Sequence, residues 1–165
     1  MKEIYKAIRN WGEEYLVFFA PNYYTLKILK INAGHKGGLQ SHHLKFETGI
    51  ILSGEMKIRK GKNINNLREI ILNKGDFFVF EPNLIHQEEA VKETYILEIS
   101  SPHFNDRVRY DHKKNDDNFL PSTTKEDVIE LKNNNDLQKI MKFGFIKVEP
   151  DEKDFLQVIL KKSFF

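Results

Sequence analysis

The chain has 165 residues, a length that suits one domain with a substantial buried core. Lys and Arg (26 residues) nearly balance Asp and Glu (24 residues), and the formal net charge of +2 is spread along the chain instead of forming a basic arm. Nucleic acid and anionic membranes are therefore not expected partners. The absence of cysteine excludes disulfides, thiolate catalysis and cysteine-bound metal clusters.

The N-terminal stretch, MKEIYKAIRNWGEEY, is charged and lacks the apolar centre of a signal peptide. No window of the sequence approaches the roughly 18 apolar residues that a membrane-spanning helix needs. We therefore expect a soluble, cytoplasmic protein.

The first half of the chain shows the pattern of short strands. Residues 1–22 mix charged and aromatic side chains up to Pro21, which indicates a strand or short helix on the outside of a sheet. Residues 25–32 (TLKILKIN) alternate apolar residues with lysine, as a half-buried strand does. Further strands are expected at residues 39–43, 46–52, 56–59, 68–72, 77–80, 85–88 and 94–99. Turn residues between them predict an antiparallel sandwich or barrel.

The composition changes after Ser100. The sequence is polar and shows no strand pattern up to Pro121, which indicates a loop or linker. Residues 122–127 carry a Ser/Thr N-cap and acidic residues, and they predict a helix that continues into residues 128–132. A second helical piece is predicted at residues 136–141. The barrel, with an N-terminal outer strand, is expected to span residues 1–112. A polar linker and a helical extension are expected at residues 113–165. The apolar tail of this extension, residues 155–165, is expected to pack on the barrel or on another subunit.

Two segments concentrate side chains that can bind a metal. Residues 37–54 hold nitrogen and oxygen donors within eight residues, namely Gln40, His42, His43 and Glu47. Residues 75–86 run from a Gly-Asp turn through the strand-like FFVF and Pro82 to His86. If the two segments are neighbouring strands of one barrel, these donors meet at one point and form a metal pocket with mixed nitrogen and oxygen ligands.

These segments resemble the two motifs of the cupin superfamily. The first motif has a Gly-rich lead-in, two ligands separated by one residue, a Glu and a closing Gly. The second has a Gly-Asp turn, a Pro and a His. Roughly residues 9–112 are similar to the small cupins related to the C-terminal domain of bifunctional mannose-6-phosphate isomerase/mannose-1-phosphate guanylyltransferase. The similar stretches are Asn10-Trp11-Gly12, LKILKINAG at 26–34, LQSHH at 39–43, SGE at 53–55 and LEISSPHFNDRVRYD at 97–111. The resemblance implies an all-β cupin jelly roll (double-stranded β-helix) with a short helical C-terminal extension.

The adjacent histidines cannot both face the inside of a barrel, because successive strand residues point to opposite faces. One register presents Gln40 with His42, and the other presents Ser41 with His43. An amide oxygen is a better ligand than a serine hydroxyl, and the resemblance implies the same Gln-x-His pair followed by a Glu and a His. The predicted ligands are therefore Gln40, His42, Glu47 and His86, with His43 in reserve. Zn is the divalent ion expected, and Mn, Fe, Co and Ni are the alternatives.

Arg109 lies where the resembling proteins carry an Arg after Asp-x-Val. Together with Lys27 or Lys45, it could hold the anionic group of a sugar phosphate through charge-assisted hydrogen bonds. The alternative interpretation is a surface ion pair of Arg109 with Asp106 or Asp111, worth at most about 1 kcal/mol.

The resemblance implies a metal-dependent sugar or sugar-phosphate isomerase or epimerase, in which the metal polarises a substrate oxygen. The proton-transferring base would be Glu47 if it does not bind the metal, or His43 if it reaches the pocket. A non-catalytic sugar-binding or regulatory cupin and an Fe(II)-dependent dioxygenase are the alternatives, and Gln40 counts against the last because cupin dioxygenases usually present His-rich ligand sets. Apolar residues outside the barrel suggest a homodimer that pairs through the outer sheet.

Overall fold

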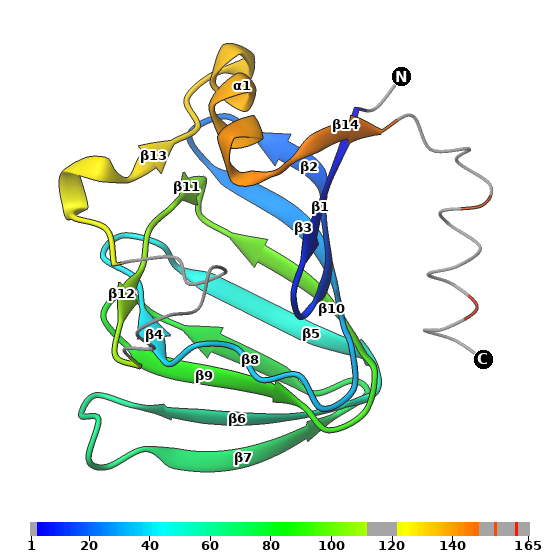
Figure 1. Ribbon diagram of the computed structural model, residues 1–165, viewed down its shortest axis with the longest axis vertical. Coiled ribbons are helices and arrows are strands. Elements are labelled where there is room, and N and C mark those ends of the chain that lie inside the picture. The colour runs from blue at the N-terminus through cyan, green and yellow to red at the C-terminus, as the bar shows by residue number, and fades with distance from the viewer. Residues whose placement is uncertain (1–2, 112–121, 149–153, 155–160, 162–165) are drawn as a thin grey trace.

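The computed structural model describes residues 3–111 and 122–148, together with Asp154 and Lys161. Two antiparallel sheets close into a jelly-roll barrel (Figure 1). The larger sheet has the strand order β14-β1-β2-β3-β10-β5-β8. Its strands are β1 (Ile4–Arg9), β2 (Gly12–Ala20), β3 (Tyr24–Ile31), β5 (Glu47–Ser53), β8 (Phe77–Phe80), β10 (Thr94–Ser100) and β14 (Ile146–Val148).

The smaller sheet has the order β12-β4-β9-β6-β7 and lies at the bottom of the view in Figure 1. Its strands are β4 (Gln40–Ser41), β6 (Glu55–Gly61), β7 (Arg68–Asn73), β9 (Ile85–Ala90) and β12 (Val108–Arg109). β11 (His103–Phe104) and β13 (Ile129–Glu130) form a separate pair. This architecture confirms the all-β jelly roll expected from the sequence.

The core between the sheets is built from the alternating apolar positions of the strands. On β6, for example, Met56 and Ile58 are buried while the intervening Lys57 is not. The core consists of Leu29, Ile31, Ile51, Met56, Ile58, Leu72, Phe78, Phe80, Ala90 and Ile96. Since both sheets contribute to it, burial of these side chains holds the barrel closed.

Within the segment from residue 122 to 148, β13 pairs with β11, α1 (Leu137–Ile140) lies near β2, and β14 extends the larger sheet beside β1 (Figure 1). The helical pieces of this segment are short, and they are η1 (Lys125–Asp127), η2 (Asn134–Asp136), α1 and η3 (Met141–Phe143). A second apolar cluster joins it to the barrel through Ala7, Leu16, Phe104, Leu131, Ile140 and Phe145. None of the helices in the described ranges is long and apolar enough to cross a membrane.

Three local predictions were wrong in whole or in part. Residues 1–22, predicted as a strand or short helix outside a sheet, do form strands, but their hairpin β1–β2 belongs to the larger sheet itself. The helix expected to continue through residues 128–132 stops after one turn at η1, because β13 pairs with β11 instead. The supposed loop after Ser100 contains β11 and β12. The predicted tail at residues 155–165 lies outside the described residues, apart from Lys161.

Candidate metal centre and cavity

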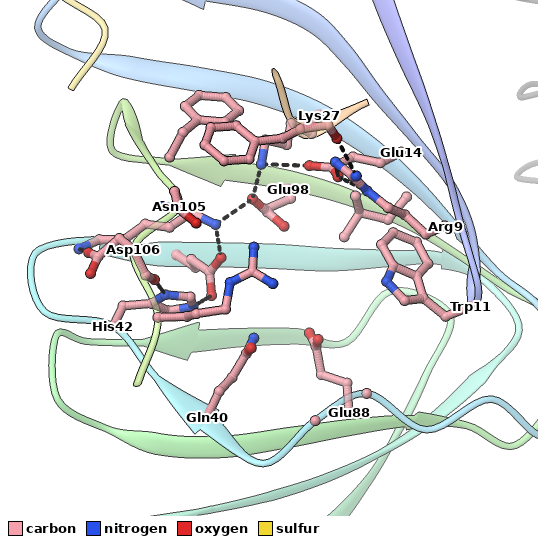
Figure 2. A pocket seen from close by; sticks show the side chains of 18 of the residues that line it. Arg9, Trp11, Glu14, Lys27, Gln40, His42, Glu88, Glu98, Asn105 and Asp106 are labelled. Carbon is pink, nitrogen blue, oxygen red and sulfur yellow. Dashed lines mark hydrogen bonds and ion pairs between the residues drawn. The ribbon is translucent and has the colours of Figure 1, made fainter. Parts of the chain in front are cut away.

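A cavity of about 720 Å³ is lined by residues of both sheets (Figure 2). Its lining is rich in charged groups, which is unusual for a barrel interior and indicates a polar ligand. The carboxylates that line it are Glu14, Glu47, Glu88, Glu98, Asp106 and Asp111. The lysines and arginines that line it are Arg9, Lys27, Lys36, Lys45, Arg107 and Arg109.

Three of the four predicted ligands meet beside this cavity, which is lined by two of them, His42 and Glu47. His42 follows β4, Glu47 begins β5 and His86 lies near the start of β9. One ligand atom from each lies within 4.8 Å of the others, and all three residues are buried. The distances to Glu47 Oε2 are 3.2 Å from His42 Nε2 and 3.7 Å from His86 Nε2.

The hydrogen bonds of the two histidines fix the tautomers that a metal site requires. Nδ1 of His42 contacts the carbonyl of Asp106, and Nδ1 of His86 lies 3.0 Å from the carbonyl of Leu84. A carbonyl can only accept, so each Nδ1 carries the proton and each Nε2 presents a lone pair. Both Nε2 atoms are buried and make no hydrogen bond within the described residues.

Two imidazole lone pairs therefore face a carboxylate oxygen with no proton between them. Three acceptors placed together are unfavourable unless a cation lies among them. Borderline divalent metals accept this set of two imidazoles and one carboxylate. The residues present thus fit a divalent metal ion.

The protonation states also suit a metal. Burial lowers the pKa of His86 to about 4, so its imidazole is neutral at pH 7. Burial raises the pKa of Glu47, but the nearby Lys45 ammonium outweighs that effect and holds the Glu47 pKa well below its ordinary value. Metal ligands must be deprotonated, and these two are. The His86 ring is held further by stacking on Phe80, with 4.0 Å between ring centroids.

Gln40 lies on the same face of the smaller sheet as His86. The two residues are directly opposite each other in the β4–β9 pairing, so their side chains project from the same face. Figure 2 shows the Gln40 side chain rising from its strand into the cavity that it lines. This position agrees with the predicted role of Gln40 as a fourth ligand, which stays a prediction.

The structure does not bring His43 to this site. The ring Nε2 of His43 lies 2.9 Å from the carbonyl of Thr123. Among the described residues, His43 is not one of those that line the cavity. His42, by contrast, directs its ring Nε2 to Glu47. The proposed catalytic and reserve-ligand roles of His43 have no geometric support.

Asp106 positions the backbone that carries the ligands. The sequence had suggested Asp106 only as a possible surface ion-pair partner of Arg109. Its carboxylate accepts the backbone N–H groups of His43, Leu44 and Lys45 at 2.7–2.8 Å. Burial raises the pKa of Asp106, but these three hydrogen bonds outweigh burial and lower the pKa. Because its own carbonyl also contacts the His42 ring, Asp106 fixes both the backbone and one imidazole of the site.

Lys27 and Lys45, which were predicted to bind an anionic substrate group, are instead neutralised by buried carboxylates. Lys27 Nζ lies 2.9 Å from Glu14 Oε1 and 3.7 Å from Glu98 Oε1. Lys45 Nζ contacts Glu47 and lies 3.7 Å from the same Glu98 oxygen. Figure 2 shows Lys27 between the carboxylates of Glu14 and Glu98. Lys45 therefore supports the ionised Glu47 and is not free for a substrate.

Arg109 lines the cavity, as its predicted substrate-binding role requires, and it also forms the ion pair offered as the alternative. Its guanidinium lies 3.0 Å from Asp111 Oδ1. A Cβ at Gly38 would meet this guanidinium, so a larger residue there would displace the end of the Arg109 side chain.

Glu88 is a further carboxylate in the cavity that the sequence reasoning missed. It is two residues from His86 on β9, so both side chains project from the same face. Figure 2 shows its carboxyl pointing into the cavity, and no hydrogen bond or ion pair of this group is found within the described ranges. Burial, with smaller effects of Glu47 and Glu98, raises its pKa to about 8. The i, i+2 spacing from His86 was the signal that could have identified it.

Comparison with known proteins agrees with this fold. Residues 27–99 match the family described as Cupin domain. The capsular polysaccharide assembling protein CapF from Staphylococcus aureus is similar in structure, with a TM-score of 0.50, 19% identity and coverage of 58% of this chain and 29% of that chain. At this identity the likeness concerns the fold alone, and the match spans less than a third of CapF.

Two further structures show weaker likeness. KdgF from Halomonas sp. has a TM-score of 0.46 and 20% identity, over 55% of this chain and 77% of that chain. A putative sugar phosphate isomerase from Acidithiobacillus ferrooxidans has a TM-score of 0.40 and 21% identity, over 47% of this chain and 49% of that chain. No curated protein matches the sequence. The narrower resemblance to the mannose-6-phosphate isomerase type stays a prediction.

Proposed function

Since residues 27–99 form a cupin domain, we propose that the protein binds a divalent metal and acts on a sugar or sugar phosphate as an isomerase or epimerase. The observation that carries this proposal is the convergence of three buried acceptor groups, on His42, Glu47 and His86, beside a polar cavity. The cavity of about 720 Å³ lies within the range of small-molecule sites and has room for a monosaccharide.

A divalent ion bound by His42, Glu47 and His86, with Gln40 as the fourth ligand, would supply a Lewis acid that polarises a carbonyl or hydroxyl oxygen of the sugar. Zn is the ion we expect, with Mn, Fe, Co and Ni as alternatives. Lys45 keeps Glu47 ionised, and the backbone carbonyls at residues 84 and 106 hold the two imidazoles in the ligating tautomer. The chain therefore presents a preorganised site.

Isomerisation also requires a group that takes a proton from one carbon and returns it to the next. Glu88 is suited to this step by its position, because its carboxyl faces the cavity and has no partner within the described residues. We assign it the role first considered for His43 or Glu47. Glu47 is engaged by Lys45 and the two histidines, and His43 faces away.

Metal content tests the first part of the proposal. We expect about one equivalent of metal, measured by elemental mass spectrometry, in protein purified without a metal-affinity column. His42→Ala and His86→Ala should lose it, while His35→Ala, which removes an exposed histidine, should keep it. A wild-type protein without metal, or equal metal in all variants, would contradict the assignment.

Activity tests the second part. The metal-loaded protein should exchange aldose and ketose forms of a sugar phosphate, and chelation should abolish the exchange. Glu88→Gln should lower kcat by at least about 100-fold while leaving metal content unchanged. No turnover on a broad sugar panel would exclude the isomerase and leave a sugar-binding cupin, and an oxygen requirement would indicate the dioxygenase instead.

A further inference from the structure

The cationic side chains of the cavity differ in whether they are already paired. Most of its lysines and arginines have a carboxylate oxygen within 4.0 Å, namely Arg9, Lys27, Lys36, Lys45 and Arg109. Arg107 also lines the cavity, yet its guanidinium makes no hydrogen bond or ion pair within the part of the chain that the structure describes. Among the described residues that line the cavity, Arg107 is therefore the cation whose guanidinium N–H groups are available to a ligand.

The surroundings of Arg107 make an unpaired charge costly. Its side chain is partly buried, and burial lowers its pKa. The nearby guanidinium groups of Arg109 and Arg9 lower this pKa further, against the opposite effect of Glu14 and Glu47. An arginine nevertheless stays charged in proteins, so the desolvated guanidinium needs an anion.

The backbone holds Arg107 in place for such an anion. Its N–H donates to Thr123 Oγ1 at 3.1 Å, and its carbonyl accepts the N–H of Thr123 at 2.9 Å. Thr123 Oγ1 also donates to the carbonyl of Asn105 at 2.6 Å. With the backbone fixed at residues 105–107, only the Arg107 side chain is left to be ordered when a ligand binds.

We propose that Arg107 binds the carboxylate or phosphate group of an anionic monosaccharide through a bidentate, charge-assisted pair. This inference rests on the proposed sugar-directed function and narrows its substrate class from sugars to sugar acids and sugar phosphates. It replaces the predicted set of Arg109, Lys27 and Lys45, whose charges are already neutralised. A ligand group bound by one of those residues would have to displace an existing carboxylate, whereas Arg107 pairs with no carboxylate of the described residues.

Trp11 provides the readout, because it is the chain's single tryptophan and it lines the cavity. Its fluorescence would be titrated with glucose 6-phosphate, glucuronate and glucose, using protein stripped of metal and then freed of the chelator. We expect saturable changes with one or both anionic sugars, at an affinity at least about tenfold above that for glucose. The order of the two anions distinguishes a phosphate site from a carboxylate site. Equal affinity for glucose and both anions would overturn the inference.

Arg107→Gln should weaken binding of the preferred anion at least about tenfold and leave glucose binding unchanged. The matched control is Arg68→Gln, which removes an exposed arginine on β7 and should bind like wild type. In the absence of ligand, the melting temperature of Arg107→Gln should equal or exceed that of wild type, because an uncompensated charge is removed. A lower melting temperature with unchanged anion affinity would show a structural role and contradict the inference.

The two proposals fail separately. A wild-type protein that prefers anionic sugars but holds no metal would remove the metal-dependent function and leave the anion site standing. A protein that holds metal but does not prefer anions would do the reverse. Arg107→Gln should keep the metal content of wild type, since Arg107 is not among the ligand groups.

Discussion

Asp106 shows how one side chain can hold a whole site. Its carboxylate satisfies three consecutive backbone N–H groups at residues 43–45, directly after the ligand His42 and before the ligand Glu47. Without it, these donors would lose their partners in a partly buried turn, and the spacing between the two ligands would no longer be fixed.

We therefore expect Asp106→Ala to lower the free energy of unfolding by at least about 2 kcal/mol and to weaken metal binding about 10- to 100-fold. Urea unfolding of the stripped protein measures the first effect, and a competitive metal titration measures the second. Asp106→Asn keeps one acceptor oxygen and should fall between wild type and Asp106→Ala. Wild-type metal affinity in both variants would show that the turn does not position the ligands.

At the residue scale, the sequence identified the three side chains that converge in the structure but not the groups that support them. His42 could be preferred to His43 because strand alternation admits only one of them, and the structure places only His42 in the cluster. Arg107 and Glu88 were missed for another reason. The spacing of Glu88 from His86 indicates its side of the strand, but the lack of a partner for either residue within the described ranges depends on the pairing of every neighbouring charge.

At the scale of strands, a network of buried charges joins three neighbours in the larger sheet. Glu14 on β2 pairs with Arg9 on β1 at 2.8 Å and with Lys27 on β3 at 2.9 Å. Burial raises the pKa of Glu14, but Lys27 and Arg9 outweigh burial and lower it to about 2, against an ordinary value of 4.5. Since the folded state binds this proton less readily than the unfolded state, the pair stabilises the fold above about pH 4.5.

This stabilisation should be lost as the pH falls from about 4.5 to about 2, and it amounts to about 3 kcal/mol when complete. The measurement is the free energy of unfolding of stripped protein at several pH values, for wild type and Glu14→Gln. Other carboxylates titrate in both proteins, so the difference between the two curves isolates Glu14. Curves that stay parallel through this window would contradict the prediction.

The predictions for whole elements succeeded where turn residues bounded a short apolar run and failed where tertiary pairing decided. The FFVF strand was predicted with its observed bounds, Phe77–Phe80. The helix predicted to begin at residues 122–127 forms only the single turn η1, because Ile129 and Glu130 pair with β11. Local capping residues cannot report such a partner, which lies more than 20 residues away in sequence.

At the scale of the whole molecule, exposed apolar residues remain on the outer strands. Phe77 is 73% exposed on β8 and Ile71 is 48% exposed on β7, and each strand is an edge of its sheet. Such edges are where a second copy would cover apolar surface and unpaired backbone groups. The homodimer and the cytoplasmic location nevertheless stay predictions.

The proposed metal would also connect the two halves of the barrel. His86 belongs to the smaller sheet and Glu47 to the larger one, so an ion shared by them joins the sheets at the ligand cluster. Binding to the folded state alone should stabilise the protein by about 4 kcal/mol at a free metal concentration 1,000 times Kd. Removal of the metal should therefore lower the melting temperature, with full recovery on adding it back.

The same measurement on variants separates this effect from nonspecific metal binding. His86→Ala should melt at one temperature with or without added metal, because the ion loses its ligand in the smaller sheet. His35→Ala should show the full wild-type shift, since this exposed histidine lies outside the cluster. An equal metal-dependent shift in both variants would mean that the ion binds elsewhere, and the sheets would then be held together by the apolar core alone.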